Sequence, residues 1–270
     1  MRELYLADLK RLLRDRLLLI TAIIGAALAL MNPLLYYGLF SVVDMGELGE
    51  LAGMVGINAK YLFFTSFLPG DNFGLIMPIL ISVIVCKDFS QGTVRNKIIH
   101  GKTRTAIFFS HFLSVATVMC ALMLLQGLLT LGISLILFDY GATFTAAEFG
   151  YFMASVALEL IVYLFVAALT AFVAVFAKNI GLCIFMLLGV SMVFSLAGSI
   201  FQSFLLFYPD GTLLPFLEFM SYANPYTANL IGTGTSYAAK DLLYLLCPTV
   251  LGGALFTALG ALVMNTKDLK

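Results

Sequence analysis

The 270-residue sequence has few charged residues and none of the usual patterns that bind a metal ion. Asp, Glu, Lys and Arg make up 11% of the chain, whereas soluble domains carry about 25%. The four cysteines stand singly in apolar stretches, without a Cys-x-x-Cys pair, and the two histidines have no ligand spacing. We therefore expect buried thiols, no metal centre and no soluble globular domain.

The sequence also lacks a complete nucleotide-binding loop. Gly101-Lys102-Thr103 matches the last three residues of a phosphate loop, but Asn96 occupies the position where that loop requires its first glycine. The preceding apolar run is too long for the buried strand that such a loop follows. The fifteen basic and fifteen acidic residues give zero net charge, so no nucleic-acid partner is indicated. We expect this chain to bind no cofactor.

Long apolar runs dominate what is present. Hydrophobic residues form 61% of the chain, and a chain this apolar crosses a bilayer as helices or as a closed barrel. The runs are unbroken and lack the alternation of a barrel, which predicts an all-α polytopic membrane protein with a single transmembrane domain. Six spans of helical length are expected. They lie at about 17–43, 72–86, 105–138, 149–177, 179–207 and 242–264.

The basic residues predict the orientation of these spans. Thirteen of the fifteen lie in the segments 1–16 and 87–104, at position 178 or after position 264. Only Lys60 and Lys240 lie in the opposite segments. Lys and Arg are retained on the cytoplasmic side during insertion. We expect a multi-pass protein of a bacterial plasma membrane with both termini in the cytoplasm. The segments 44–71 and 208–241 are then extracellular, and the second contains short helices that re-enter the outer leaflet.

Residues 1–16 form an amphipathic pattern. Leu6, Leu9 and Leu13 share one helical face, while most charged side chains fall elsewhere. This pattern predicts a helix on the inner surface of the membrane, where it contacts lipid and serves as an anchor or as a contact with a partner protein.

The loop 87–104 has helix signals of its own. Thr93 is expected as an N-cap and Gly101 as a left-handed residue just beyond the helix end. Val94 and Ile98, four residues apart, give the helix one apolar edge, and Thr103 caps the following span. Such a helix between two spans is either a mechanical input or a solvated loop.

The pattern Asp88-Phe89-Ser90-Gln91-Gly92-Thr93 after the second of six spans, followed by a basic helix and Gly101-Lys102-Thr103-Arg104, resembles the ABC-2 type permeases of bacterial ABC transporters. The likeness is to permeases of bacteriocin or peptide export and immunity in particular. It implies a dimer of this chain with a second, identical or related permease. It also implies two copies of a separate ATP-binding subunit, which would hold ATP and Mg²⁺. In that family the loop after the second span is a coupling helix that docks on the ATPase. The residues implied to dock are Asp88, Phe89, Gly92, Thr93, Arg95, Lys97, Ile98, Gly101 and Lys102.

Three functions follow from these observations. The first is a non-catalytic permease subunit of an ABC exporter for a hydrophobic or amphipathic substrate, such as a peptide antibiotic, a lipid or a drug. The second is an ion-coupled carrier that uses Glu159, a carboxylate within the fourth span and a possible part of a translocation path. Alternatively, Glu159 is a structural residue that is hydrated near the membrane edge or paired with a hydroxyl group. The third is a membrane immunity protein that binds a toxin without ATP turnover.

Overall fold

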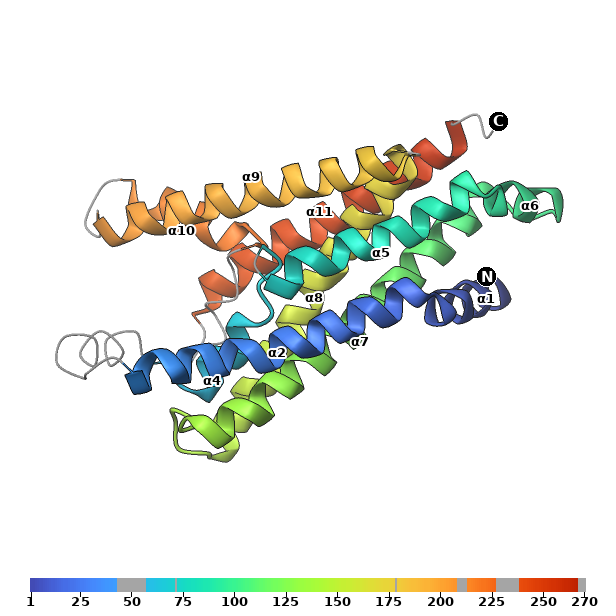
Figure 1. The fold of residues 1–270 in the computed structure, drawn as a ribbon. Coiled ribbons are helices and arrows are strands. Elements are labelled where there is room, and N and C mark those ends of the chain that lie inside the picture. Colours follow the sequence, from blue (N-terminus) through green and yellow to red (C-terminus); the bar gives the residue numbers. More distant parts are fainter. Residues whose placement is uncertain (43–56, 71, 178, 208–212, 227–237, 267–270) are drawn as a thin grey trace.

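The computed structural model of the chain describes residues 1–42, 57–70, 72–177, 179–207, 213–226 and 238–266. Regular structure in these residues is entirely helical, as the sequence predicts. Six long helices run along one common direction in Figure 1. They are α2 (Arg16–Val42), α5 (Asn72–Ser90), α7 (Arg104–Leu137), α8 (Ala146–Ala177), α9 (Ile180–Phe207) and α11 (Ala239–Thr266).

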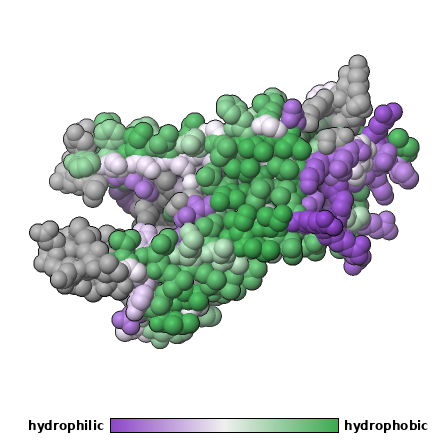
Figure 2. All heavy atoms as spheres, in the orientation of Figure 1, coloured by the Kyte–Doolittle hydropathy of each residue, from purple (hydrophilic) through white to green (hydrophobic). Residues whose placement is uncertain are grey.

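Each of these six helices is long and apolar enough to cross a membrane. Their most apolar windows have a mean hydropathy between 1.7 and 2.7, and Figure 2 shows a hydrophobic surface over the middle of the molecule. Hydrophilic residues gather at the end that carries the short helices α1 (Arg2–Arg14) and α6 (Thr93–Ile99). We call this the basic end. The chain is therefore a multi-pass membrane protein, and the start of α1 and the end of α11 lie at the basic end (Figure 1).

The second membrane helix is longer than the sequence predicts. The expected span ends at position 86 because Lys87 and Asp88 follow it, but α5 continues to Ser90. Both charged side chains are paired with residues of the N-terminal segment, Lys87 with Asp15 at 3.7 Å and Asp88 with Arg11. With these charges paired, the helix continues about one turn past the expected span, whose own boundary stays a prediction.

Two further short helices lie at the end opposite the basic end (Figure 1). Of these, α4 (Ala59–Thr65) packs against α7, and its rings at Phe63 and Phe64 are buried. The second, α10 (Leu214–Ala223), packs against α9 and α11. About half of the expected outer segments lies outside the described residues, namely 44–56, 71, 208–212 and 227–237.

A buried ion pair fixes α4 to α8. Lys60 Nζ lies 2.6 Å from Glu148 Oε1, and these side chains are only 5% and 8% exposed. The same ammonium group lies 4.7 Å from the centre of the Tyr151 ring. Tyr140 donates a 3.3 Å hydrogen bond to Glu148. Burial and the Glu148 carboxylate raise the pKa of Tyr140 to about 12.

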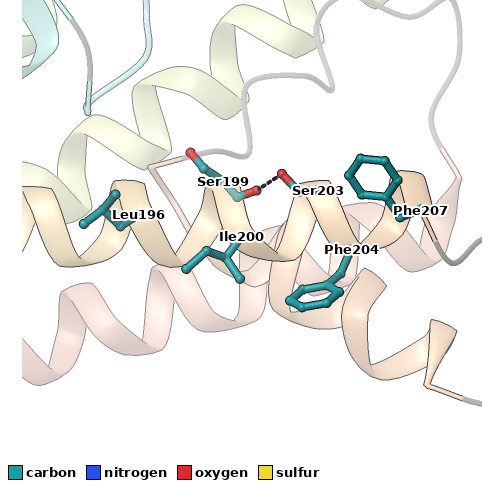
Figure 3. A pocket seen from close by; sticks show the side chains of 6 residues that line it. All are labelled: Leu196, Ser199, Ile200, Ser203, Phe204 and Phe207. Carbon is teal, nitrogen blue, oxygen red and sulfur yellow. Dashed lines mark hydrogen bonds between the residues drawn. The ribbon is translucent and has the colours of Figure 1, made fainter.

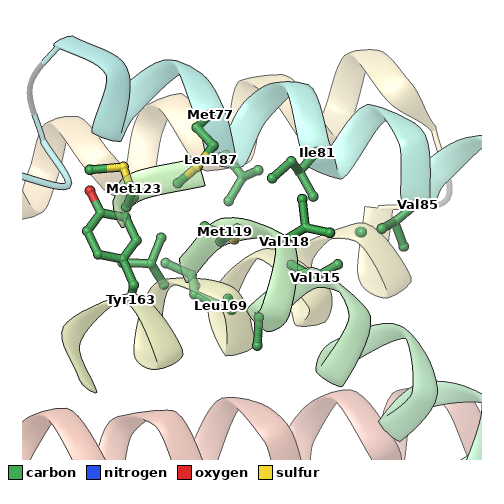
Figure 4. Packing of buried hydrophobic residues seen from close by; sticks show 14 of the residues in the cluster. Met77, Ile81, Val85, Val115, Val118, Met119, Met123, Tyr163, Leu169 and Leu187 are labelled. Atoms are coloured by element: carbon green, nitrogen blue, oxygen red, sulfur yellow. The ribbon is translucent and has the colours of Figure 1, made fainter. Parts of the chain in front are cut away.

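The hydrophobic core lies between α5, α7, α8 and α9 (Figure 4). It is built from β-branched and sulfur-containing side chains at helical spacing, such as Met77, Ile81 and Val85 on α5, which are at most 1% exposed. Opposite them lie Val115, Val118, Met119, Met123, Tyr163, Leu169 and Leu187. This core holds α5 and α7 together, so any force on the α6 segment between them reaches both helices.

Candidate functional site

The helix α6 is formed by local sequence signals at both ends. Gly92 precedes it with a φ of 71°, and Gly101 follows it with a φ of 78°, a left-handed conformation that glycine adopts without steric cost. The prediction for Gly101 is confirmed. The prediction that Thr93 caps the helix is wrong, because Thr93 is its first residue and Gly92 is the N-cap without a side-chain bond. Thr103 caps α7 as expected, accepting a 3.3 Å bond from the Ala106 N–H.

An apolar cluster at the basic end holds α6 on the bundle. Val94 is 1% exposed and Ile98 is half-buried, which confirms the predicted apolar edge. The cluster includes Leu4 of α1 and Met264 of α11. Its remaining members are Ile107, Phe108, Ala171 and Val175. The cluster therefore joins α6 to four other helices, α1, α7, α8 and α11.

Asp8 of α1 lies at the centre of a group of polar side chains beside this cluster. Its carboxylate accepts hydrogen bonds from the Lys97 ammonium of α6 and, at 2.5 Å, from the Ser110 hydroxyl of α7. The Asp8 residue is only 1% exposed. A buried carboxylate needs such donors, and here they come from two different helices. Asp8 therefore ties α1 to both α6 and α7.

A second buried carboxylate, Asp88 of α5, faces the same helix α1. Both terminal nitrogens of Arg11 contact the two Asp88 oxygens, a bidentate geometry that fixes orientation as well as distance. His111 of α7 lies between the two acids, with Nδ1 at 3.6 Å from Asp88 Oδ2 and 4.0 Å from Asp8 Oδ2. His111 is 1% exposed, and within the described residues neither of its ring nitrogens has a hydrogen-bond partner.

We call Asp8, Arg11, Asp88, Lys97, Ser110 and His111 the charge cluster. Burial by itself raises the pKa of Asp8, but His111 and the bonds from Lys97 and Ser110 lower it further, so the pKa lies below its ordinary value. Burial also lowers the pKa of Lys97, and this effect exceeds the opposing one of Asp8. The carboxylate of Asp8 therefore stays charged at neutral pH despite its burial.

The structure divides the predicted docking residues into two groups. Asp88 and Lys97 are used within the chain, because Asp88 is 2% exposed and bound to Arg11 and Lys97 is bound to Asp8. The docking of both residues on a second protein stays a prediction. Phe89 is half-buried, with its ring centre 6.3 Å from that of His111. Arg95 and Lys102 are exposed and remain available on the outer face of the α6 segment.

Sequence reasoning missed four members of the charge cluster, namely Asp8, Arg11, Ser110 and His111. The helix α1 buries Leu4, Asp8 and Leu12, whereas the expected apolar face of Leu6, Leu9 and Leu13 includes two side chains that are 41% and 61% exposed. Spacing of four residues from Leu4 to Asp8 and Leu12 was the available signal. It was hidden because a charged residue stands in the middle of the buried face.

A comparison with known families was made for the whole sequence. The family described as "Protein of unknown function (DUF2705)" matches residues 18–269. The chain belongs to this family. No curated protein matches the sequence. The DUF2705 match includes α6 and all six membrane helices but begins within α2, so Asp8 and Arg11 of α1 lie outside the matched residues.

Glu159 of this DUF2705 protein lies inside the bundle, on α8. Its residue is 5% exposed, and its Oε2 has no hydrogen-bond partner among the described residues. Among the described residues no hydroxyl group is paired with Oε2, and the alternative of a hydrated position near the membrane edge stays a prediction. No group of three or more potential metal ligands occurs among the described residues.

A groove of about 610 Å³ lies beside the outer half of α9 (Figure 3). Its walls are mostly apolar, and the hydroxyl groups of Ser199 and Ser203 donate to carbonyl oxygens of their own helix at 2.9 and 2.8 Å. The lining residues are Leu196, Ser199, Ile200, Ser203, Phe204 and Phe207. Such a surface suits an apolar or amphipathic molecule, whether a substrate or a lipid chain.

Proposed function

We propose that this chain is the permease subunit of an ATP-driven exporter of the ABC-2 type. The supporting observation is α6, a short helix with an exposed outer face that is fixed to three other helices. Apolar contacts join it to the bundle, the Lys97–Asp8 bond joins it to α1, and its ends continue into α5 and α7. A partner that moves α6 therefore moves two membrane helices and α1 together.

The partner in this proposal is a separate ATP-binding subunit in the cytoplasm. The basic end faces it, so both termini are cytoplasmic, and two permeases, identical or related, bind two copies of the ATPase. The Gly101-Lys102-Thr103 stretch forms a helix boundary on this chain, and ATP with Mg²⁺ belongs to the partner. The substrate is a hydrophobic or amphipathic molecule, in keeping with the apolar groove beside α9.

The test is copurification of the tagged permease from its native membrane, followed by assay of ATP hydrolysis. Arg95→Glu with Lys102→Glu should release the ATPase, because both side chains are exposed on the α6 segment. Lys10→Glu with Arg14→Glu is the matched control, with the same charge change on exposed residues of α1. The proposal fails if no ATPase accompanies the wild-type protein, and the α6 contact fails if both double variants retain it equally.

A second function, an ion-coupled carrier, is favoured by Glu159 alone. A buried carboxylate oxygen without a partner in a membrane helix suggests a transported or coupled ion. Transport by reconstituted vesicles distinguishes the two functions. Activity that stops without the ATPase supports the exporter, whereas activity that needs only an ion gradient and no ATPase supports the carrier.

A further inference from the structure

The helix α8 presents two buried glutamates on one face. Glu148 and Glu159 are eleven residues apart, which is close to three helical turns or roughly 16 Å along the axis. Glu148 has a complete environment, since Lys60 supplies an ammonium group that also lies over the Tyr151 ring. A carboxylate and an aromatic face thus bind one ammonium group at the start of α8.

Glu159 lies further along the same helix and is buried to a similar degree. It is 5% exposed, compared with 7% for Glu148. Tyr163 follows Glu159 by one turn, and its fully buried ring lies edge-on to the ring of Phe67, with 6.5 Å between the ring centres. Among the described residues no side chain bonds to Glu159 Oε2.

A second unpartnered polar side chain, Gln126 of α7, lies at the same level of the bundle. Met123 of α7 and Tyr163 of α8 are neighbours in the core (Figure 4). The helices α7 and α8 are antiparallel. Gln126 lies about one turn after Met123 and Glu159 lies one turn before Tyr163, so both are displaced from this pair toward the same end of the bundle. Gln126 is 2% exposed, and neither its amide nitrogen nor its amide oxygen has a partner among the described residues.

Two contacts of Phe67 lie at this level of the bundle, one with α8 and one with α7. The Phe67 carbonyl oxygen accepts a 2.9 Å hydrogen bond from the Tyr163 hydroxyl. On the other side, the Phe67 ring lies so close to Gly127 that a Cβ atom there would meet it. Phe67 therefore lies between α7 and α8 at the level of Gly127 and Tyr163, which are one residue from Gln126 and one turn from Glu159.

The chemistry of this place favours a cation with hydrogen atoms to donate. A carboxylate oxygen and an amide oxygen both accept hydrogen bonds from such a cation. We propose that Glu159 and Gln126 form a buried site for the ammonium group of an amphipathic molecule. This inference rests on the proposed export function for its biological meaning, because the bound molecule is then the substrate. The flexible Met119 and Met123 side chains adjust to admit it.

Labelling of Glu159 by dicyclohexylcarbodiimide tests the site in the full-length protein in lipid nanodiscs. This apolar reagent adds to a carboxylic acid: the acid proton moves to one nitrogen, the carboxyl oxygen bonds the central carbon, and an acyl shift gives a stable N-acylurea. Mass spectrometry of the Glu159 peptide measures the rate. Dodecylammonium should slow labelling at least fivefold, because the occupied carboxylate does not react, whereas dodecanol of equal chain length should not.

Matched variants assign the effect to the two residues. Glu159→Gln should abolish labelling of this peptide, whereas Glu218→Gln on α10 should leave it unchanged. Gln126→Leu should remove most of the protection by dodecylammonium, whereas Gln202→Leu on α9 should retain it. Equal protection by the amine and the alcohol, or none by either, overturns the proposal.

A direct measurement decides the case in which the reagent does not reach Glu159. Radiolabelled dodecylammonium bound per protein should then fall at least fivefold in Glu159→Gln nanodiscs, and equal binding to both proteins refutes the site. Neither assay contains an ATPase. A negative result here therefore leaves the proposed exporter intact, and a protein that binds no ATPase can still give a positive result.

Discussion

Arg11 contacts both carboxylate oxygens of Asp88 through its two terminal nitrogens, and this pair connects the N-terminal helix with the last turn of α5. The two side chains differ in exposure, 35% for Arg11 and 3% for Asp88. The pair is therefore asymmetric. Arg11 can be hydrated when Asp88 is removed, whereas Asp88 cannot be hydrated when Arg11 is removed.

We expect Arg11→Met to destabilise the protein more than Asp88→Asn. Removal of Arg11 leaves a buried carboxylate without its cation, a loss of about 3–5 kcal/mol, whereas Asp88→Asn leaves a neutral amide and a guanidinium that reaches water, a loss of about 1–2 kcal/mol. Unfolding of the two purified variants in mixed micelles measures the difference. Equal losses would show that the observed asymmetry of burial has no energetic effect.

The second prediction concerns acid. The pKa of Asp8 is lower in the folded protein than its ordinary value, so the unfolded state takes up the proton first as the pH falls. The stabilisation from Asp8 is therefore complete above about pH 4 and is lost as the pH falls through the folded pKa. Spin labels at Lys10 of α1 and Ile99 of α6, in a Cys247→Ser background, should give one narrow distance at pH 7 and a broad distribution once the pH has fallen below the folded pKa of Asp8.

The Asp8→Asn variant provides the control for this measurement. Its amide cannot titrate, and it cannot pair with the Lys97 charge, so the distance should be broad at neutral pH as well. A narrow distance in Asp8→Asn at pH 7 would mean that apolar contacts alone hold α1 against α6.

The third prediction concerns the two glycines that bound α6. Gly92 and Gly101 have φ values of 71° and 78°, and no atom lies within 4 Å of a Cβ added at either position. Substitution by Ala should therefore cost only backbone strain, about 1 kcal/mol at each site. Asn should cost less than Ala at both sites, since Asn tolerates this conformation. Thermal unfolding of the four single variants gives this order, and an Ala variant as stable as the Asn variant contradicts it.

The fourth prediction concerns packing between α7 and α11. A Cβ atom at Gly260 would meet the ring of Phe108, so Gly260→Ala should lose about 1–3 kcal/mol by overpacking. Gly132→Ala on α7 is the control, because nothing lies within 4 Å of its added Cβ. The double variant Gly260→Ala with Phe108→Leu should recover part of the loss. Additive losses in the double variant would place the strain elsewhere.

The membrane helices could be predicted because their signal is local. Long uncharged runs indicate spans without knowledge of their neighbours, and the glycine at position 101 ends α6 through its own backbone. The continuation of α5 past the expected span could not be predicted, because its cause is not local. Whether Lys87 and Asp88 end a helix depends on Asp15 and Arg11, which are more than seventy positions away.

The charge cluster could not be predicted for the same physical reason. His111 has no polar neighbour at ligand spacing in the sequence, and its two acids come from α1 and α5. For Asp8, charge argued for the surface, although position on the Leu4–Leu12 face argued for burial. The balance between desolvation and pairing decides such a case, and the pairing partners are visible only in the folded chain.

The separation between Asp8 and its partners has a consequence for biosynthesis. Lys97 lies 89 residues and Ser110 lies 102 residues after Asp8, and a ribosome needs on the order of 5–20 s to translate that length. During this interval α1 has left the ribosome and its carboxylate is hydrated. The N-terminal helix therefore reaches its final position only after the third membrane helix has been inserted, so this end of the protein is completed late although it is synthesised first.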